Sequence, residues 1–321
     1  MKKIESRSPS ARAQGRTLLE LLVAITIGLV VLGALIVVYL STGASSRQAT
    51  AISRMNEDAA IALDFVGTQL RMAGFSIPRR SVAAGAVMVD KVLVSVPDRN
   101  FIGAAIRACD HGFANPTVAA FEDLACSDAA TGAAAFALRF EGADEAGSDG
   151  ARALLPNTDC LDQAVAATRY SASAMSDSYP SYPLVESRFI VGVSKSNGTP
   201  ELSCGGNGKP SFASQPITQY VEDMTLRYGL AADGQSPDVV QYVDKAADVD
   251  ALGGTVDQRW SRVVTVRLCL LMRSAEPDPA GAGKYVDCDG QPALSGDGLI
   301  RRAYVSTIAL RNRGGFAGGA P

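Results

Sequence analysis

The sequence has little of the chemistry that catalysis and metal binding require. Its 321 residues include one histidine, one tryptophan and six cysteines, and no two cysteines form a Cys-x-x-Cys pair. The single histidine, His111, excludes His-rich metal sites and leaves any Ser-His-Asp arrangement dependent on one loop residue. A loop histidine without a recognisable partner is usually a solvated side chain. We therefore expect no catalytic residue, no metal site, no cofactor and no enzyme activity.

Two stretches match ligand-binding loops only in part. Residues 205–209 are rich in glycine, but Ser203 replaces the first glycine of a phosphate loop and Pro210 replaces its final Ser or Thr. Residues 287–290 have a fragment of calcium-loop spacing, without the final glutamate. We interpret the first stretch as a turn and do not assign calcium to the second.

Basic residues are not in excess. Lysine and arginine number 30 against 33 aspartates and glutamates, which gives a formal net charge of −3. A protein that binds nucleic acid would show a basic stripe or patch. Nucleic acid is therefore not an expected partner.

Proline is absent between Thr17 and Ile77, so one long helix without a proline kink is possible there. Of the 23 residues from 18 to 40, 16 are Leu, Ile or Val, and Glu20 is the one charged residue. At about 1.5 Å per residue, such a helix crosses a hydrocarbon core of about 30 Å. The summed insertion free energy of the Leu, Ile and Val residues outweighs the cost of one carboxylate, which is at most about 3 kcal/mol. We predict a membrane span at 18–40, in which the charge of Glu20 has a function.

The same helix is expected to continue as an amphipathic one. Apolar residues recur at three- and four-residue spacing at Ile52, Met55, Ala59, Leu63, Val66 and Leu70. Gly74 and Pro78 are stop signals. We predict a cytoplasmic segment at 1–15, a helix at 16–73 and a β-rich globular domain at 74–321.

The globular domain should pack an antiparallel sheet against the second half of the helix, in an α+β arrangement. Strands are predicted at 87–96, 136–140, 188–193, 225–228, 263–272 and 303–310. The nearly continuous apolar run at 263–272 is typical of an interior strand. Residues 141–150 and 171–183 are predicted surface loops.

All six cysteines follow the predicted span. Residues 1–15 are basic and should stay in the cytoplasm, so the domain beyond Leu40 should face an oxidising compartment, where disulfides persist. Six cysteines allow many connectivities, and the sequence does not choose among them. We expect sequential pairing: Cys109 with Cys126, Cys160 with Cys204, and Cys269 with Cys288.

A glycine borders the apolar run, and a glutamate follows five residues later: Gly15-Arg16-Thr17-Leu18-Leu19-Glu20. This resembles the processing site of type IV prepilins. The resemblance implies cleavage between Gly15 and Arg16, N-methylation of Arg16, and an assembly role for Glu20. The family usually has phenylalanine where this chain has Arg16. A secretory signal peptide cut near residues 41–44, or a plain signal anchor, are the alternatives.

Motifs at both ends of the domain resemble the PilW family, the large minor pilins of type IV pilus assembly. They lie at 70–75, 262–268, 296–302 and 308–313. The resemblance implies a pilin-like α+β fold and the role of a scarce subunit in a priming complex at the pilus tip. Its partners would be other minor pilins, the major pilin, a tip adhesin and the prepilin peptidase. It would sit in the inner membrane as a single-pass protein, with its domain in the periplasm, and enter the assembled pilus.

Two other functions share parts of this pattern. One is a type II secretion pseudopilin of the J type, which has the same processing site and general fold. The other is a membrane-anchored periplasmic binding module without a filament role.

Cleavage after Gly15 predicts a defined mature mass. Intact-mass measurement of the chain from its native membrane should show loss of residues 1–15, and one added methyl group if Arg16 is modified. A mature chain that begins near Ser45 would contradict prepilin processing and indicate ordinary signal peptidase.

Overall fold

The computed structural model describes residues 17–76, 87–89, 92–94, 101, 103–118, 120–142, 157–166, 182–209, 212–234, 236–278, 281 and 283–312. The predicted cytoplasmic segment 1–15, the cleavage site Gly15–Arg16 and most of the loops at 141–150 and 171–183 lie outside these residues. The chain divides into two compact units, Met1–Thr50 and Ala51–Pro321.

One helix, α1, extends over 55 residues from Leu18 to Met72, as predicted. Thr17 precedes it, and its Oγ1 accepts a hydrogen bond from the backbone N–H of Glu20 at 3.3 Å. Gly74 follows it with φ of +75°, the left-handed conformation that commonly ends a helix. The N–H of Gly74 donates to the carbonyl of Arg139 at 2.9 Å and ties the helix end to a strand.

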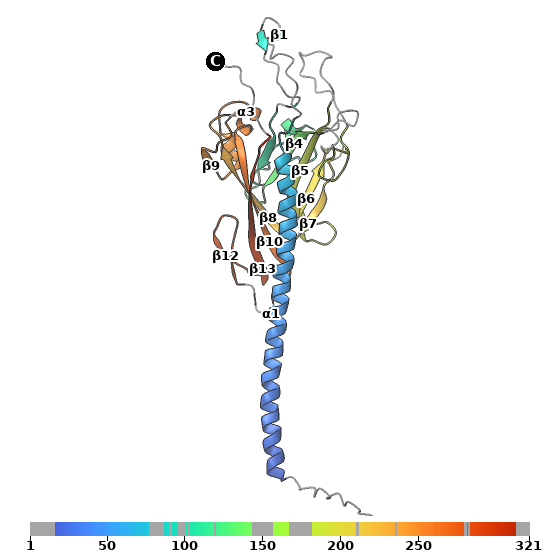
Figure 1. Ribbon diagram of the computed structural model, residues 1–321, viewed down its shortest axis with the longest axis vertical. Coiled ribbons are helices and arrows are strands. Elements are labelled where there is room, and N and C mark those ends of the chain that lie inside the picture. The colour runs from blue at the N-terminus through green and yellow to red at the C-terminus, as the bar shows by residue number, and fades with distance from the viewer. Residues whose placement is uncertain are drawn as a thin grey trace, which may run out of the picture. The chain divides into compact units, whose positions relative to one another are not determined.

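The second unit contains two larger antiparallel sheets (Figure 1). Sheet 1 has the order β3 (Ile106–Cys109), β4 (Ala135–Glu141), β5 (Leu184–Val193), β6 (Pro200–Gly206) and β7 (Gln215–Gln219). Sheet 2 has the order β13 (Leu299–Ala309), β10 (Val263–Pro277), β8 (Val221–Leu230) and β9 (Gln241–Val243). Two hairpins, β1 (Val87–Val89) with β2 (Val92–Val94) and β11 (Lys284–Val286) with β12 (Pro292–Leu294), complete the strands described. The short helices are α2 (Ala246–Asp250), α3 (Val256–Trp260) and the 3-10 turn η1 (Phe121–Asp123).

Tyr220 connects the two sheets. It lies between β7 and β8 and has φ of +64°, which is uncommon for a bulky residue. Its N–H donates to the carbonyl of Pro200 of sheet 1 at 2.6 Å. Its own carbonyl accepts from the N–H of Arg273 of sheet 2 at 2.9 Å. These two bonds hold the chain at the corner where it passes from one sheet to the other.

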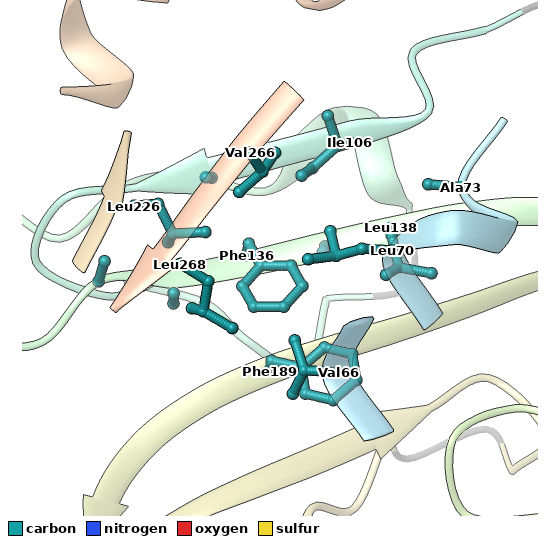
Figure 2. Packing of buried hydrophobic residues seen from close by; sticks show 14 of the residues in the cluster. Val66, Leu70, Ala73, Ile106, Phe136, Leu138, Phe189, Leu226, Val266 and Leu268 are labelled. Atoms are coloured by element: carbon teal, nitrogen blue, oxygen red, sulfur yellow. The ribbon is translucent and has the colours of Figure 1, made fainter. Parts of the chain in front are cut away.

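The second half of α1 packs between the two sheets. Its buried residues are Met55, Ala59, Ala62, Val66, Gly67 and Leu70. Figure 2 shows Val66 and Leu70 beside Phe136 and Phe189 of sheet 1 and Leu268 of sheet 2, and all five belong to one buried cluster. The rings of Phe136 and Phe189 stack with centroids 4.8 Å apart. The helix is therefore part of the domain core.

The three disulfides pair as predicted: Cys109 with Cys126, Cys160 with Cys204, and Cys269 with Cys288. Their sequence separations are 17, 44 and 19 residues. In the chain-entropy account, closing loops of this size stabilises a domain by about 3 to 4 kcal/mol per bridge.

Most predicted strands are present, and β10 is an interior strand between β13 and β8, as predicted. The single strand predicted at 87–96 is wrong in its extent: β1 and β2 are two short strands that pair with each other. Asp90 and Lys91 interrupt the apolar run between them. The strands not predicted from the sequence are β3, β6, β7, β9, β11 and β12. The predicted turn at 205–209 begins later than expected, because Gly205 and Gly206 still belong to β6.

The packing of α1 predicts a contrast between two helix positions. Leu70 is fully buried and Ile61 is 62% exposed. Leu70→Ala should lower the free energy of unfolding by about 2 to 5 kcal/mol, because it leaves a cavity. Ile61→Ala should change it by less than about 0.5 kcal/mol. Denaturant unfolding of the full chain in detergent, followed by the fluorescence of the buried Trp260, measures both. Equal effects at the two positions would contradict this packing.

Candidate assembly surfaces

The first unit exposes the apolar part of α1. Seventeen large apolar side chains between Leu18 and Leu40 are 49% to 79% exposed. This helix is the one described segment long and apolar enough to cross a membrane, with a mean hydropathy of 3.1 in its most apolar window, none of which is buried. Exposed apolar surface of this extent is costly in water. It marks a surface that lipid or other proteins cover.

Glu20 lies in the first turn of α1, within this apolar surface, and its side chain is exposed. An acidic group near a helix N-terminus interacts favourably with the helix dipole. Among the residues that the structure describes, none forms an ion pair with its carboxylate. The group is therefore accessible to a partner.

The second unit offers another candidate surface, the side of sheet 2 that faces away from α1. The disulfide from Cys269 of β10 to Cys288 attaches the segment that carries the β11–β12 hairpin to this side. Arg301 of β13 reinforces the attachment. Its guanidinium donates to Glu222 at 2.5 and 2.8 Å, to Asp297 at 2.7 Å twice, and to Ser295 at 3.0 Å. These hydrogen bonds hold the pKa of Asp297 well below its usual range.

Asp223 of β8 lies under the same segment in an acidic environment. Burial, together with the charges of Asp289, Asp287 and Glu222, raises its pKa from 3.8 to about 6. Asp287 Oδ1 accepts from the N–H groups of Asp289 and Gln291 at 3.0 and 2.7 Å. The Asp287 carboxylate thus caps a turn, which explains the fragment of calcium-loop spacing. Among the described residues, no group of three or more potential ligands could hold a metal ion.

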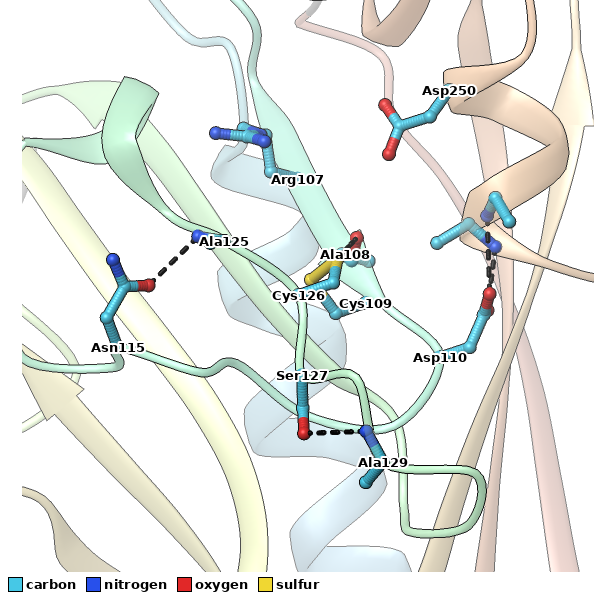
Figure 3. The surroundings of a disulfide bond; sticks show 12 residues. Arg107, Ala108, Cys109, Asp110, Asn115, Ala125, Cys126, Ser127, Ala129 and Asp250 are labelled. Carbon is cyan, nitrogen blue, oxygen red and sulfur yellow. Dashed lines mark hydrogen bonds between the residues drawn. A yellow bond between two sulfur atoms is a disulfide. The ribbon is translucent and has the colours of Figure 1, made fainter.

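A cavity of about 470 Å³ lies beside the Cys109–Cys126 disulfide (Figure 3). Its lining includes Asp110, His111, Ser127 and Asp250. The two oxygens of Asp110 accept the N–H groups of Ala246 and Ala247, at 2.7 and 3.2 Å, and fix the start of α2 to the end of β3. Asp250 accepts from the indole N–H of Trp260 at 2.8 Å. The Asp110 carboxylate therefore joins α2 to β3, and the Asp250 carboxylate joins α2 to α3.

This cavity contains a serine, a histidine and aspartates, but they are not arranged as a catalytic triad. His111 Nδ1 lies 3.2 Å from the carbonyl of Gly132, where a triad would place a carboxylate. Ser127 Oγ accepts from the N–H of Ala129 at 3.2 Å. Within the described part of the chain, no hydrogen bond joins Ser127 to His111. His111 is exposed, as predicted for a solvated loop residue.

Two buried arginines were not anticipated from the sequence, and both have internal partners. Arg139 contacts Glu122 at 2.5 Å and lies 4.2 Å from the ring centroid of Phe121. Arg188 contacts Glu186 at 2.5 Å and lies over the ring of Phe212 at 3.6 Å. Burial lowers the pKa of Arg188 and outweighs the attraction of Glu186. The first pair holds β4 to η1, the second joins two residues of β5, and both arginines are compensated within the domain.

One comparison with known proteins gives a match, and it covers the C-terminal part of the chain. Residues 188–312 match the sequence model of the family described as Type IV Pilus-assembly protein W. The match extends from β5 through β13 and therefore includes all of sheet 2 and the Arg301 network. No curated protein and no solved structure matches the chain significantly. The family match indicates involvement in type IV pilus assembly.

The raised pKa of Asp223 predicts a pH-dependent stability. A carboxyl whose pKa is higher in the folded state stabilises the fold while protonated, and this contribution is lost as pH rises from about 4 to 6. Asp223→Asn should therefore raise the free energy of unfolding at pH 7 by about 1 kcal/mol, after allowance for solvent screening. Its advantage over the wild type should vanish below about pH 4.

Unfolding curves of the full chain between pH 4 and pH 8 test this. The matched control is Asp238→Asn, because Asp238 is an exposed acid outside the cluster. The same pH profile for both variants would contradict the claim that ionised Asp223 destabilises the fold.

Proposed function

We propose that this protein is a minor pilin, which joins other minor pilins in a complex that starts type IV pilus assembly and stays at the tip. The observation that carries the proposal is the exposed apolar surface of α1 with Glu20 in its first turn, on a chain whose C-terminal part matches a pilus-assembly family.

The apolar surface gives the subunit two environments. In the membrane, lipid covers residues 18–40. In a filament, the equivalent helices of neighbouring subunits cover them. Because both environments are apolar, transfer between them costs little hydrophobic free energy. The transfer therefore needs a specific interaction that lipid does not provide.

Glu20 provides this interaction. Cleavage between Gly15 and Arg16 would create a positively charged amino terminus four residues before Glu20. A carboxylate in lipid is costly, and so is an ammonium group. Pairing Glu20 with the amino terminus of a neighbouring subunit neutralises both charges and fixes the register of the two helices.

Arg16 would add a positive charge at the amino terminus of this subunit. It would be the first residue of the mature chain and would place a second cation beside the amino terminus. Its long side chain can extend towards the lipid head groups, which keeps the guanidinium in a polar environment. We infer that the prepilin peptidase cuts and methylates this amino terminus, and that the domain lies on the periplasmic side of the inner membrane.

Two other functions would share the exposed helix. A type II secretion pseudopilin of the J type would use Glu20 in the same way, in a different assembly. A membrane-anchored binding module would need the apolar segment but not Glu20. The match to a pilus-assembly family over residues 188–312 favours the pilus.

Substitution of Glu20 separates a filament subunit from a passive anchor. Glu20→Ala should insert at least as well as the wild type, because a charge that costs up to about 3 kcal/mol is gone. Recruitment should fail, because no carboxylate meets the neighbour's amino terminus. We expect the variant to remain in the membrane and the yield of sheared pili to fall.

The matched control is Glu57→Ala, which removes an exposed glutamate from the second half of the same helix. It should assemble like the wild type. Crosslinking between minor pilins and the pilus yield should be measured for both variants. Wild-type values for Glu20→Ala would show that Glu20 is only a tolerated charge.

A further inference from the structure

The outer side of sheet 2 is covered at one end and open at the other. On β10, Cys269 and Leu271 point to this side and are 5% and 7% exposed, because the disulfide-attached segment lies over them. Two residues further back along the same strand, Arg267 is exposed. β10 is a central strand, so this arginine lies in the middle of an open sheet surface.

Arg267 lies next to another arginine. Its cross-strand neighbour on β8 is Arg227, and its neighbour on β13 is Thr307. Like charges directly opposite each other on adjacent strands destabilise a sheet. Arg227 is compensated by Asp244 at 3.2 Å and Asp289 at 3.7 Å. Among the described residues, none forms an ion pair with Arg267. The sheet therefore presents an uncompensated guanidinium, although the chain as a whole is acidic.

A small cavity lies at this position. Its volume is about 30 Å³, and its lining residues are Thr225, Arg227, Arg267, Cys269, Cys288 and Val305. The Cys269–Cys288 disulfide fixes two of these residues. A cavity of this size has room for a small group such as one carboxylate. Two guanidinium groups and a threonine hydroxyl are suitable donors for it.

Apolar side chains lie on the same sheet surface. Val305, the β13 neighbour of Cys269, is 47% exposed. Tyr242 of β9 is 56% exposed, and its hydroxyl lies 3.4 Å from Thr265 Oγ1 of β10. Arginine and tyrosine beside exposed apolar residues are the composition typical of protein interfaces.

We propose that this surface binds a neighbouring pilus subunit, and that a carboxylate of that subunit enters the cavity between Arg227 and Arg267. The proposal rests on the function proposed above and adds a second contact, on the globular domain. Charge complementarity selects the partner: an acidic side chain on a protein surface, flanked by apolar residues that cover Val305 and Tyr242. The disulfide and the Arg301 network hold one wall of the site in place before the partner arrives.

A photo-crosslinker tests the contact in cells that carry the complete pilus machinery. The residue p-benzoylphenylalanine at position 305 should crosslink to another pilin, at a site next to an aspartate or glutamate. Position 307 serves as a second site if the change at 305 disturbs the domain. A crosslink to a second copy of this chain, or none from either position, would overturn the proposal.

Charge reversal then tests the arginine itself. Arg267→Glu should reduce the crosslink by about tenfold, the effect expected for loss of one close charge pair, and Arg267→Gln should reduce it less. An arginine in place of the partner's acidic residue should restore the crosslink to Arg267→Glu. The matched control is Lys195→Glu, a charge reversal at an exposed residue in the turn between β5 and β6, which should have no effect.

The outcomes separate this proposal from the one it rests on. Equal crosslinking in Arg267→Glu and Lys195→Glu, while Glu20→Ala still blocks assembly, would overturn the sheet-surface contact and leave the proposed function standing. Normal assembly in Glu20→Ala and Arg267→Glu alike would overturn both. The formation of all three disulfides in each variant shows that the domain has folded.

Discussion

The structure depends on how the apolar side chains of one long helix, α1, are removed from water. From Met55 to Leu70, one side of α1 is buried by side chains of both sheets. From Leu18 to Leu40, the side chains of the same helix are exposed. The domain therefore satisfies the hydrophobic effect for the second half of α1 only. The first half requires lipid or other helices, and this requirement is the physical basis of the proposed transfer from a membrane to a filament.

Hydrogen bonds, a disulfide and ion pairs hold the two sheets and the segment that covers part of sheet 2. Tyr220 links the two sheets through hydrogen bonds to each of them. The Cys269–Cys288 disulfide and Arg301 hold a segment over one end of sheet 2. The rest of that side, around Arg267, is open. A rigid, partly covered sheet is suited to recognising a partner because little ordering is needed when the partner binds.

Sequence patterns predicted the features that depend on local periodicity or on large apolar runs. They predicted α1 and the interior strand β10, but they did not determine the pairing of the six cysteines. They missed β6 and β7, whose Pro200, Gly205, Gly206 and Pro216 disfavour strands and which form because neighbouring strands offer hydrogen-bond partners.

The open side of sheet 2 could not be predicted for a related reason. Arg227, Arg267 and Val305 come from three strands, and only the register of β8, β10 and β13 brings them together. Register depends on the whole core and not on any one segment. Sequence did identify Glu20, because an acidic residue within an apolar run is visible without a fold. The most direct measurement of the central claim is the location of the mature chain after pili are sheared from cells. Our account predicts a small, reproducible amount of the chain in the purified pilus fraction, without residues 1–15. A chain found only in membranes, in cells whose pilus yield is unchanged when it is deleted, would contradict it.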